Sequence, residues 1–177
     1  MNLENLLIKE LSKANIDFVG GLAIQDEAVF EELWSLFLSN RDPASRRAAW
    51  VIDTLSEETP KLIEKRIDEI IEALPYFIHP ALRRHSLRML RPFNISEKHL
   101  GFLTGFCFEH LLKASEPPAV KVHCMDILMK ISETEPSIKR ELSDSIRWRM
   151  HEESPGFQNR ALKYLTKLEK DLAEEAL

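Results

Sequence analysis

The stretch RDPASRRAAWVIDTL (41–55) occurs in four related copies along the chain, and this repetition decides the fold. The other copies, which align with it without a gap, are IHPALRRHSLRMLRP (78–92), EPPAVKVHCMDILMK (116–130) and ESPGFQNRALKYLTK (153–167). They are headed by Pro43, Pro80, Pro118 and Pro155, at spacings of 37, 38 and 37 residues. A period in this range indicates a stacked array of repeats, because one such unit cannot bury its own apolar face.

Each copy has the pattern of an amphipathic helix. Proline suits the first helical turn, where its missing N–H needs no partner and its φ is already helical. At 100° per residue, Leu82 and Met89 of the second copy fall on one face, whereas Arg84, Arg88 and Arg91 fall on the opposite face. The pattern therefore predicts one buried side and one solvated side.

One position in the repeat is always small, six residues after the proline. It holds Ala49, Ser86, Cys124 and Ala161. We expect neighbouring helices to approach closely at this position, so all four side chains should be mostly buried. Trp50, at the next position, is predicted to belong to the core. Trp148 lies between two arginines and is the tryptophan that we expect to be partly exposed.

A second helix is predicted before each copy. The four segments with helical periodicity are 26–40, 56–74, 96–115 and 132–153, and their candidate N-caps are Asp26, Ser56, Ser96 and Ser132. No segment alternates with the period of a strand, so we expect no sheet.

The ends of the chain complete this organisation. An opening helix over 2–14 should cap the stack, and residues 15–25, with Gly20 and Gly21, are interpreted as a connector. The last helix should run to about Glu175. We therefore expect a single domain over 1–177, with a cap and connector over 1–25 and four helix-pair repeats over 26–177.

The chain resembles the HEAT and armadillo class of α-solenoids, whose second helices carry a Pro-x-x-Arg-x-x-Ala-like pattern. PASRRAAW (43–50) fits best, and PALRRHSL (80–87) and PAVKVHCM (118–125) are degenerate versions. The resemblance covers about residues 26–170. It implies an all-α, right-handed α-α superhelix that serves as a binding scaffold with its second helices on the concave side. It also implies that the family's cationic position, here Arg46, Arg83 and Lys121, braces neighbouring repeats. Such fold-level analogy does not identify a partner.

The composition fits a soluble protein with a continuous core. Hydrophobic residues make up 44% of the 177 residues and charged residues 30%. We find neither a long apolar run nor a signal-peptide pattern, so we expect a cytoplasmic protein and no membrane association. The two cysteines, Cys107 and Cys124, lie on predicted buried faces, which favours a reducing compartment.

Charge is segregated between the repeated segments and the rest of the chain. The four copies carry +1, +4, 0 and +2, whereas the whole chain carries −5, so the remaining residues carry −12. The candidate binding residues are Arg47, Arg84, Arg88, Arg91 and Lys163, with Val122 and Asp126 interrupting the row on the third copy. If the second helices line one face, these cations would form a basic groove for an acidic segment. The alternative interpretation is an ordinary solvated face.

No catalytic, cofactor or metal signature is found. His85 and His123 share a repeat position, but no carboxylate or thiol spacing completes a metal site around them. Gly20 and Gly21 lack the residues of a phosphate-binding loop. We therefore expect a non-enzymatic protein without a cofactor or a bound metal.

Two functional interpretations remain open. The first is a scaffold module that binds a protein partner. The alternative is a nucleic-acid-binding protein resembling the HEAT-like alkylpurine DNA glycosylases, although their catalytic residues cannot be matched to positions in this chain.

Overall fold

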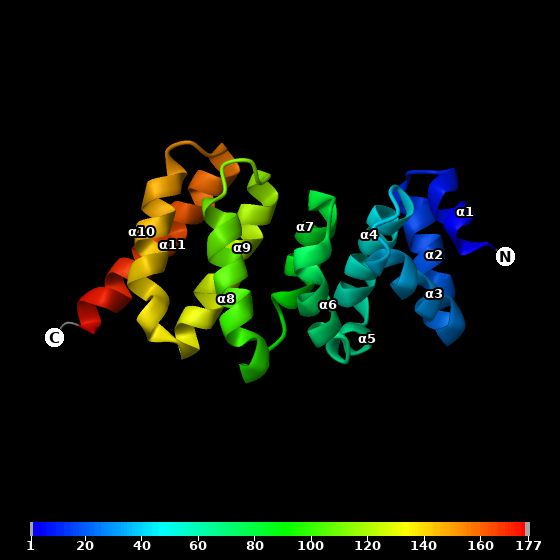
Figure 1. Cartoon of the computed structure of the whole chain (residues 1–177), viewed down its shortest axis with the longest axis horizontal. Helices are drawn as coiled ribbons and strands as arrows, with labels where there is room; N and C mark the ends of the chain where they lie inside the picture. The colour runs from blue at the N-terminus through cyan, green and yellow to red at the C-terminus, as the bar shows by residue number, and fades with distance from the viewer. Residues whose placement is uncertain (1, 176–177) are drawn as a thin grey trace. The chain divides into compact units, whose positions relative to one another are not determined.

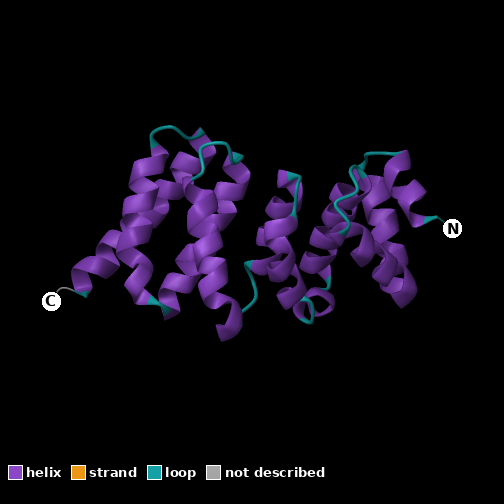
Figure 2. Ribbon diagram, viewed as in Figure 1, coloured by secondary structure: helices purple, strands orange, loops and turns teal. Residues whose placement is uncertain are grey.

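The computed structural model describes residues 2–175, and within these it contains only helices and the loops that join them (Figure 2). The elements are α1 (Leu3–Lys9), α2 (Lys13–Gln25), α3 (Glu27–Leu38), α4 (Ala44–Glu58), α5 (Pro60–Glu64), α6 (Ile67–Ala73), α7 (Pro80–Leu90), α8 (Glu97–Leu112), α9 (Pro118–Thr134), α10 (Lys139–Met150) and α11 (Pro155–Glu174), with 3₁₀ turns η1 (Leu74–Tyr76) and η2 (Pro136–Ile138). The all-helical class predicted from the sequence is confirmed.

The helices form two compact units, of which unit 1 ends at Phe93 and unit 2 begins at Asn94. In unit 1, α4 packs against α2, α3 and α7, so it is the central helix (Figure 1). Its buried face includes Ala48, Val51 and Ile52. In unit 2, α8 packs against α9, α10 against α11, and the second helices α9 and α11 against each other. Each unit thus contains two of the repeated segments as packed second helices.

The connector predicted over 15–25 is wrong, because these residues form most of α2. The two glycines suggested a break, yet neither has a positive φ. Ile16, Val19 and Ala23 are buried. At Gly20 a β-carbon would lie 3.2 Å from Leu55 Cδ2 of α4. Gly20 therefore allows α2 to approach α4 closely, and burial outweighs the low helix propensity of glycine.

The predicted helices over 56–74 and 132–153 begin later than expected. Ser56 and Ser132 are not N-caps: each is buried inside the preceding second helix, and its hydroxyl donates to a carbonyl three residues earlier. Both second helices end just before a proline, at Thr59–Pro60 and at Glu135–Pro136, because the residue before a proline disfavours helical backbone. The first helix of the second pair is further divided into α5 and α6. Of the other two proposed caps, Asp26 accepts from Ala28 N–H at 2.9 Å, whereas Ser96 makes no side-chain cap bond.

The small repeat position behaves as predicted. Ala49, Ser86, Cys124 and Ala161 each have a relative exposure of 0%. The next position is less uniform, since Leu87 and Met125 are buried, Trp50 is only half-buried and Leu162 is 55% exposed. The prediction that Trp50 belongs fully to the core was therefore wrong. Trp148 is exposed, as expected, and both cysteines are buried and free.

Candidate protein-interaction surface

Helix α7 carries three exposed arginines on the side opposite its core residues. Arg84, Arg88 and Arg91 are exposed, whereas Leu82 and Met89 are buried, as the helical periodicity predicts. Of the five candidate cations, these three share one helix of unit 1.

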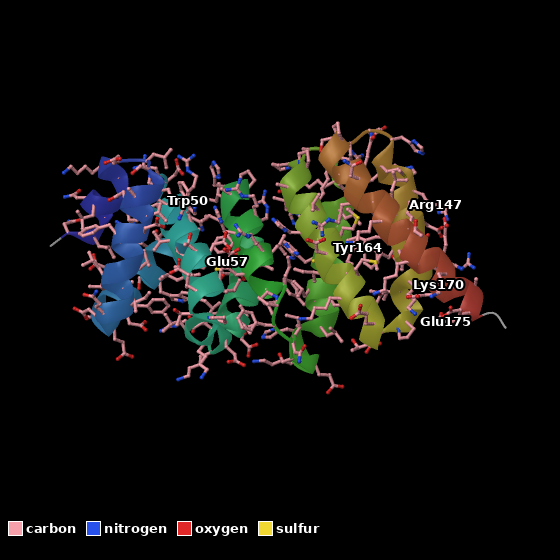
Figure 3. The ribbon with its side chains drawn as sticks, turned by 180° about the vertical axis from the view of Figure 1, so that it is seen from behind. Trp50, Glu57, Arg147, Tyr164, Lys170 and Glu175 are labelled. Atoms are coloured by element: carbon pink, nitrogen blue, oxygen red, sulfur yellow. The ribbon has the colours of Figure 1, made fainter. Side chains whose placement is uncertain are left out.

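The arginine in the middle of this row is paired with carboxylates of α4. Arg88 Nη1 donates to Asp53 Oδ2 at 3.1 Å, and its Nη2 donates to the carboxylate of Glu57. Glu57, labelled in Figure 3, belongs to α4. Asp53 is 1% exposed, whereas the side chain of Glu57 is 61% exposed. Arg88 therefore joins the second helices of two successive repeats, and part of its charge is compensated within the chain.

His85 connects the buried aspartate to another arginine of the row. His85 Nδ1 lies 2.6 Å from Asp53 Oδ2, and Arg84 Nη2 lies 2.9 Å from His85 Nε2. The partner of Arg84 in this contact is an imidazole and not a carboxylate, so the contact leaves the positive charge of Arg84 uncompensated.

Sequence reasoning missed Asp53, although a signal was present. Ten residues after the repeat proline, the other three copies have Leu90, Leu128 and Leu165, all of which are buried. Asp53 therefore occupies a core position, and a buried carboxylate requires partners. It finds them in His85 and Arg88, while its Oδ1 atom is buried without a hydrogen bond.

The remaining two candidate cations lie on other helices. Arg47 Nη1 donates to Leu7 O at 2.7 Å, so this guanidinium satisfies a carbonyl near the end of α1. That Arg47 faces the same groove as Arg84 stays a prediction, with one of its Nη atoms engaged by this carbonyl. Lys163 is exposed on α11 and belongs to unit 2.

Unit 2 joins its second helices by a similar arrangement. Asp126 Oδ1 of α9 accepts from Arg160 Nη1 at 3.0 Å and from Tyr164 Oη of α11 at 2.6 Å (Figure 3). Burial, together with this hydrogen bond to a carboxylate, raises the pKa of the Tyr164 phenol. The hydrogen bond with Tyr164 and the charge of Asp126 raise the pKa of Arg160. In both units, a second-helix aspartate thus receives donors from the next second helix.

At the family's cationic position, Lys121 contacts the next repeat. Lys121 is 1% exposed, and its Nζ lies 2.5 Å from Glu153 Oε1, at the start of the fourth copy. Arg149 also donates to Glu153, from Nη2 at 2.5 Å and from Nε at 3.0 Å. Burial opposes ionisation of Glu153, but hydrogen bonds and charge from these two cations outweigh it and lower the pKa of the carboxyl. Lys121 therefore braces the last two repeats, as the resemblance implies.

The other two residues at this position make local contacts. Arg83 donates to Phe77 O at 2.6 Å, which holds the loop before its own helix. Arg46 Nε lies 2.7 Å from Asp42 Oδ1, one turn earlier.

A pocket of about 410 Å³ lies between α2, α3 and the α5–α6 segment. One wall is Arg66, whose guanidinium lies 5.0 Å from the Trp34 ring centroid and pairs with Glu31. Trp34 Nε1 donates to Glu69 at 2.8 Å. The lining contains Ala23, Ile24, Glu27, Phe30, Glu31, Lys61, Leu62, Lys65, Arg66 and Glu69. Its charged groups are of both signs, so it favours no particular ligand charge.

Between residues 2 and 175, no group of three or more His, Cys, Asp or Glu side chains is arranged to hold a metal ion. In the same range, no helix is both long and apolar enough to cross a membrane.

The sequence matches the family model described as HEAT repeat domain over residues 3–168. This match covers most of the chain, and the chain therefore belongs to the HEAT repeat family. HEAT repeats generally mediate protein–protein interactions, and the family is typically non-enzymatic. The comparisons with curated proteins and with solved structures returned no match.

Proposed function

We propose that this HEAT repeat protein is a scaffold that binds a partner protein through a negatively charged segment. The segment lies against the exposed side of the last second helix of unit 1, with Arg84, Arg88 and Arg91 as its main contacts. Guanidinium groups suit this role because they form charge-assisted, bidentate bonds with carboxylates.

The observation that carries the proposal is the row of exposed arginines on α7. Arg84 is exposed and contacts an imidazole and not a carboxylate, so its charge is available to a partner. Arg88 is held in place by Asp53 and Glu57, and its side chain remains 42% exposed. A fixed guanidinium loses less conformational entropy when it binds than a mobile one.

The test is affinity purification from source cells with the intact chain as bait, followed by measurement of binding to the recovered partner. The variant Arg84→Glu/Arg91→Glu reverses two charges and leaves Arg88 in place to pair with the buried Asp53. We expect about ten-fold weaker binding, because the two exposed pairs together contribute up to about 2 kcal/mol. Added salt should also weaken binding by the unmodified chain.

A matched control is Lys9→Glu/Lys113→Glu, which makes the same charge change at two exposed lysines that are not part of α7. It should retain the partner. Equal retention by the Arg84→Glu/Arg91→Glu variant, with its helical circular dichroism intact, would show that the arginine row is only a solvated face.

A further inference from the structure

The position two residues before the repeat proline differs sharply between the two units. In unit 2 it holds Glu116, which is 3% exposed, and Glu153, whose side chain is 4% exposed. In the second copy of unit 1 the same position holds Ile78, which is 80% exposed. A position that buries a carboxylate in one unit therefore presents a large apolar side chain to solvent in the other.

This difference removes the expected partner of Arg46. In unit 2, Lys121 pairs with Glu153 of the next copy. Arg46 is equivalent to Lys121 in the repeat, and Ile78 is equivalent to Glu153. Without a carboxylate in the next copy, Arg46 pairs with Asp42 of its own turn and remains 42% exposed, whereas Lys121 is buried. Arg46 Nη2 also donates to Asp42 Oδ2 at 3.2 Å, so both contacts of this guanidinium with a carboxylate are to a residue of its own turn.

The loop that carries Ile78 is held rigidly beside the turn that contains Asp42. Asn40, at a φ of 57°, donates from Nδ2 to Tyr76 O and accepts from Ile78 N–H, each at 3.0 Å. Between these two residues, Phe77 is buried, with its ring centroid 5.3 Å from that of Phe37. Tyr76 and Ile78 are 75% and 80% exposed on either side of it. Apolar side chains fixed in this way can be covered by a partner at a small cost in entropy.

We propose that Arg46, Tyr76 and Ile78 form a second docking point, which receives a carboxylate and an adjacent apolar side chain of a partner protein. The partner's carboxylate takes the position relative to Arg46 that Glu153 takes relative to Lys121. Its apolar side chain covers Tyr76 and Ile78. This inference rests on the proposed function only in one respect, namely that the ligand is part of a protein. Arg46, Tyr76 and Ile78 are not part of the arginine row on α7.

The direct test uses N-acetyl-L-leucine, which carries a carboxylate beside an apolar side chain, and the neutral N-acetyl-L-leucinamide as its control. Each is titrated into the isotope-labelled chain and followed by NMR. We expect saturable shifts of the Arg46 Nε–H signal and of the Tyr76 and Ile78 amides with the carboxylate. The amide should bind about ten-fold more weakly, because it lacks the charge-assisted bond. Equal binding of both compounds, or the absence of saturable shifts, would overturn the proposal.

A second test supplies the carboxylate within the chain. In the variant Ile78→Glu, the new side chain should pair with Arg46, as Glu153 does with Lys121, and abolish the shifts caused by N-acetyl-L-leucine. Ile78→Gln is the matched control, because it removes the apolar group without adding a charge. It should retain a weakened, carboxylate-dependent shift at Arg46. If Ile78→Glu binds the compound as well as the unmodified chain, the proposal is wrong.

The variant Arg84→Glu/Arg91→Glu separates this site from the α7 row. It should leave the shifts at Arg46, Tyr76 and Ile78 unchanged. If the shifts disappear in that variant, the carboxylate binds to the arginine row, which overturns the second docking point and leaves the proposed function standing.

Discussion

At the residue scale, buried acidic side chains join neighbouring repeats. Asp53 and Glu153 are both almost fully buried, and each is reached by donors from a different part of the fold. Removing one partner of such a pair costs more than the pair itself contributes, because the remaining charge stays buried without compensation. These residues are therefore sensitive points for the stability of each unit.

Replacing Glu153 by glutamine should lower the free energy of unfolding by about 3 kcal/mol at neutral pH, because Lys121 and Arg149 lose their shared carboxylate. The pKa of Glu153 is lower in the folded chain than its ordinary value of 4.5. Its contribution is therefore complete above the ordinary glutamate range and is lost as the pH falls through the lower, folded-state pKa. Urea unfolding measured from neutral to acidic pH checks both points.

The control for this prediction is Glu152→Gln, since the side chain of Glu152 is 71% exposed and pairs with the same Arg149. It should change stability by less than about 1 kcal/mol. If the acid dependence is the same in the unmodified chain and in Glu153→Gln, the buried cluster does not stabilise the fold in this way.

Tyr164 should ionise at higher pH than an unperturbed tyrosine. Burial and the hydrogen bond to Asp126 both favour the neutral phenol and raise its pKa. The chain has two tyrosines, so a Tyr76→Phe background isolates Tyr164 for an absorbance titration. Adding Asp126→Asn should lower the titration midpoint, because a negative acceptor is removed. A midpoint that does not change, or that rises, on this substitution would contradict the assigned cause.

At the scale of the helices, one glycine in α2 is needed for packing and its neighbour is not. A β-carbon at Gly20 would lie 3.2 Å from Leu55 Cδ2, whereas one at Gly21 would meet nothing within 4 Å. Gly21→Ala should stabilise the chain by about 0.5–1 kcal/mol through helix propensity. Gly20→Ala should be less stable than Gly21→Ala, because Leu55 must shift. Thermal unfolding of the two variants provides the measurement, and equal gains would contradict close packing of α2 on α4.

The small position of the second helices should not tolerate a large residue. Ala49 and Ala161 are completely buried at equivalent positions in α4 and α11. Replacing either by leucine should cost about 1–3 kcal/mol through overpacking. Urea unfolding checks this prediction, and Leu162→Ala, at an exposed position in α11, is the matched control. Variants as stable as the unmodified chain would refute the alignment of the repeats.

Sequence reasoning located the second helices well, because Pro43, Pro80, Pro118 and Pro155 and a small residue six positions later mark them. It failed for α2, where burial of apolar side chains outweighed the low helix propensity of two glycines. It also failed at Ser56 and Ser132, which lie inside the preceding helix instead of capping the next one. The exposed side of α7 followed from its periodicity. The ion pairs that hold Arg88 and the hydrogen bond from Arg47 to Leu7 O were not predicted, since side-chain partners on other helices depend on three-dimensional register.

At the scale of the whole molecule, membership of the HEAT repeat family leads us to expect protein binding. Each of the two units contains a pair of packed second helices. The single domain over residues 1–177 remains a prediction from the sequence. In unit 1, α7 offers exposed arginines, and the loop before it offers Tyr76 and Ile78. The pocket beside Arg66 lies among the first helices and has charges of both signs. Our account therefore assigns partner binding to the second helices.

The most direct test of this assignment is hydrogen–deuterium exchange of the intact chain, measured alone and saturated with the recovered partner. The account predicts slower exchange in peptides from α7 and from the loop before it, with little change in α3, α5 and α6. Slower exchange confined to α3, α5 and α6 would place the partner at the pocket beside Arg66 and would contradict binding through the second helices.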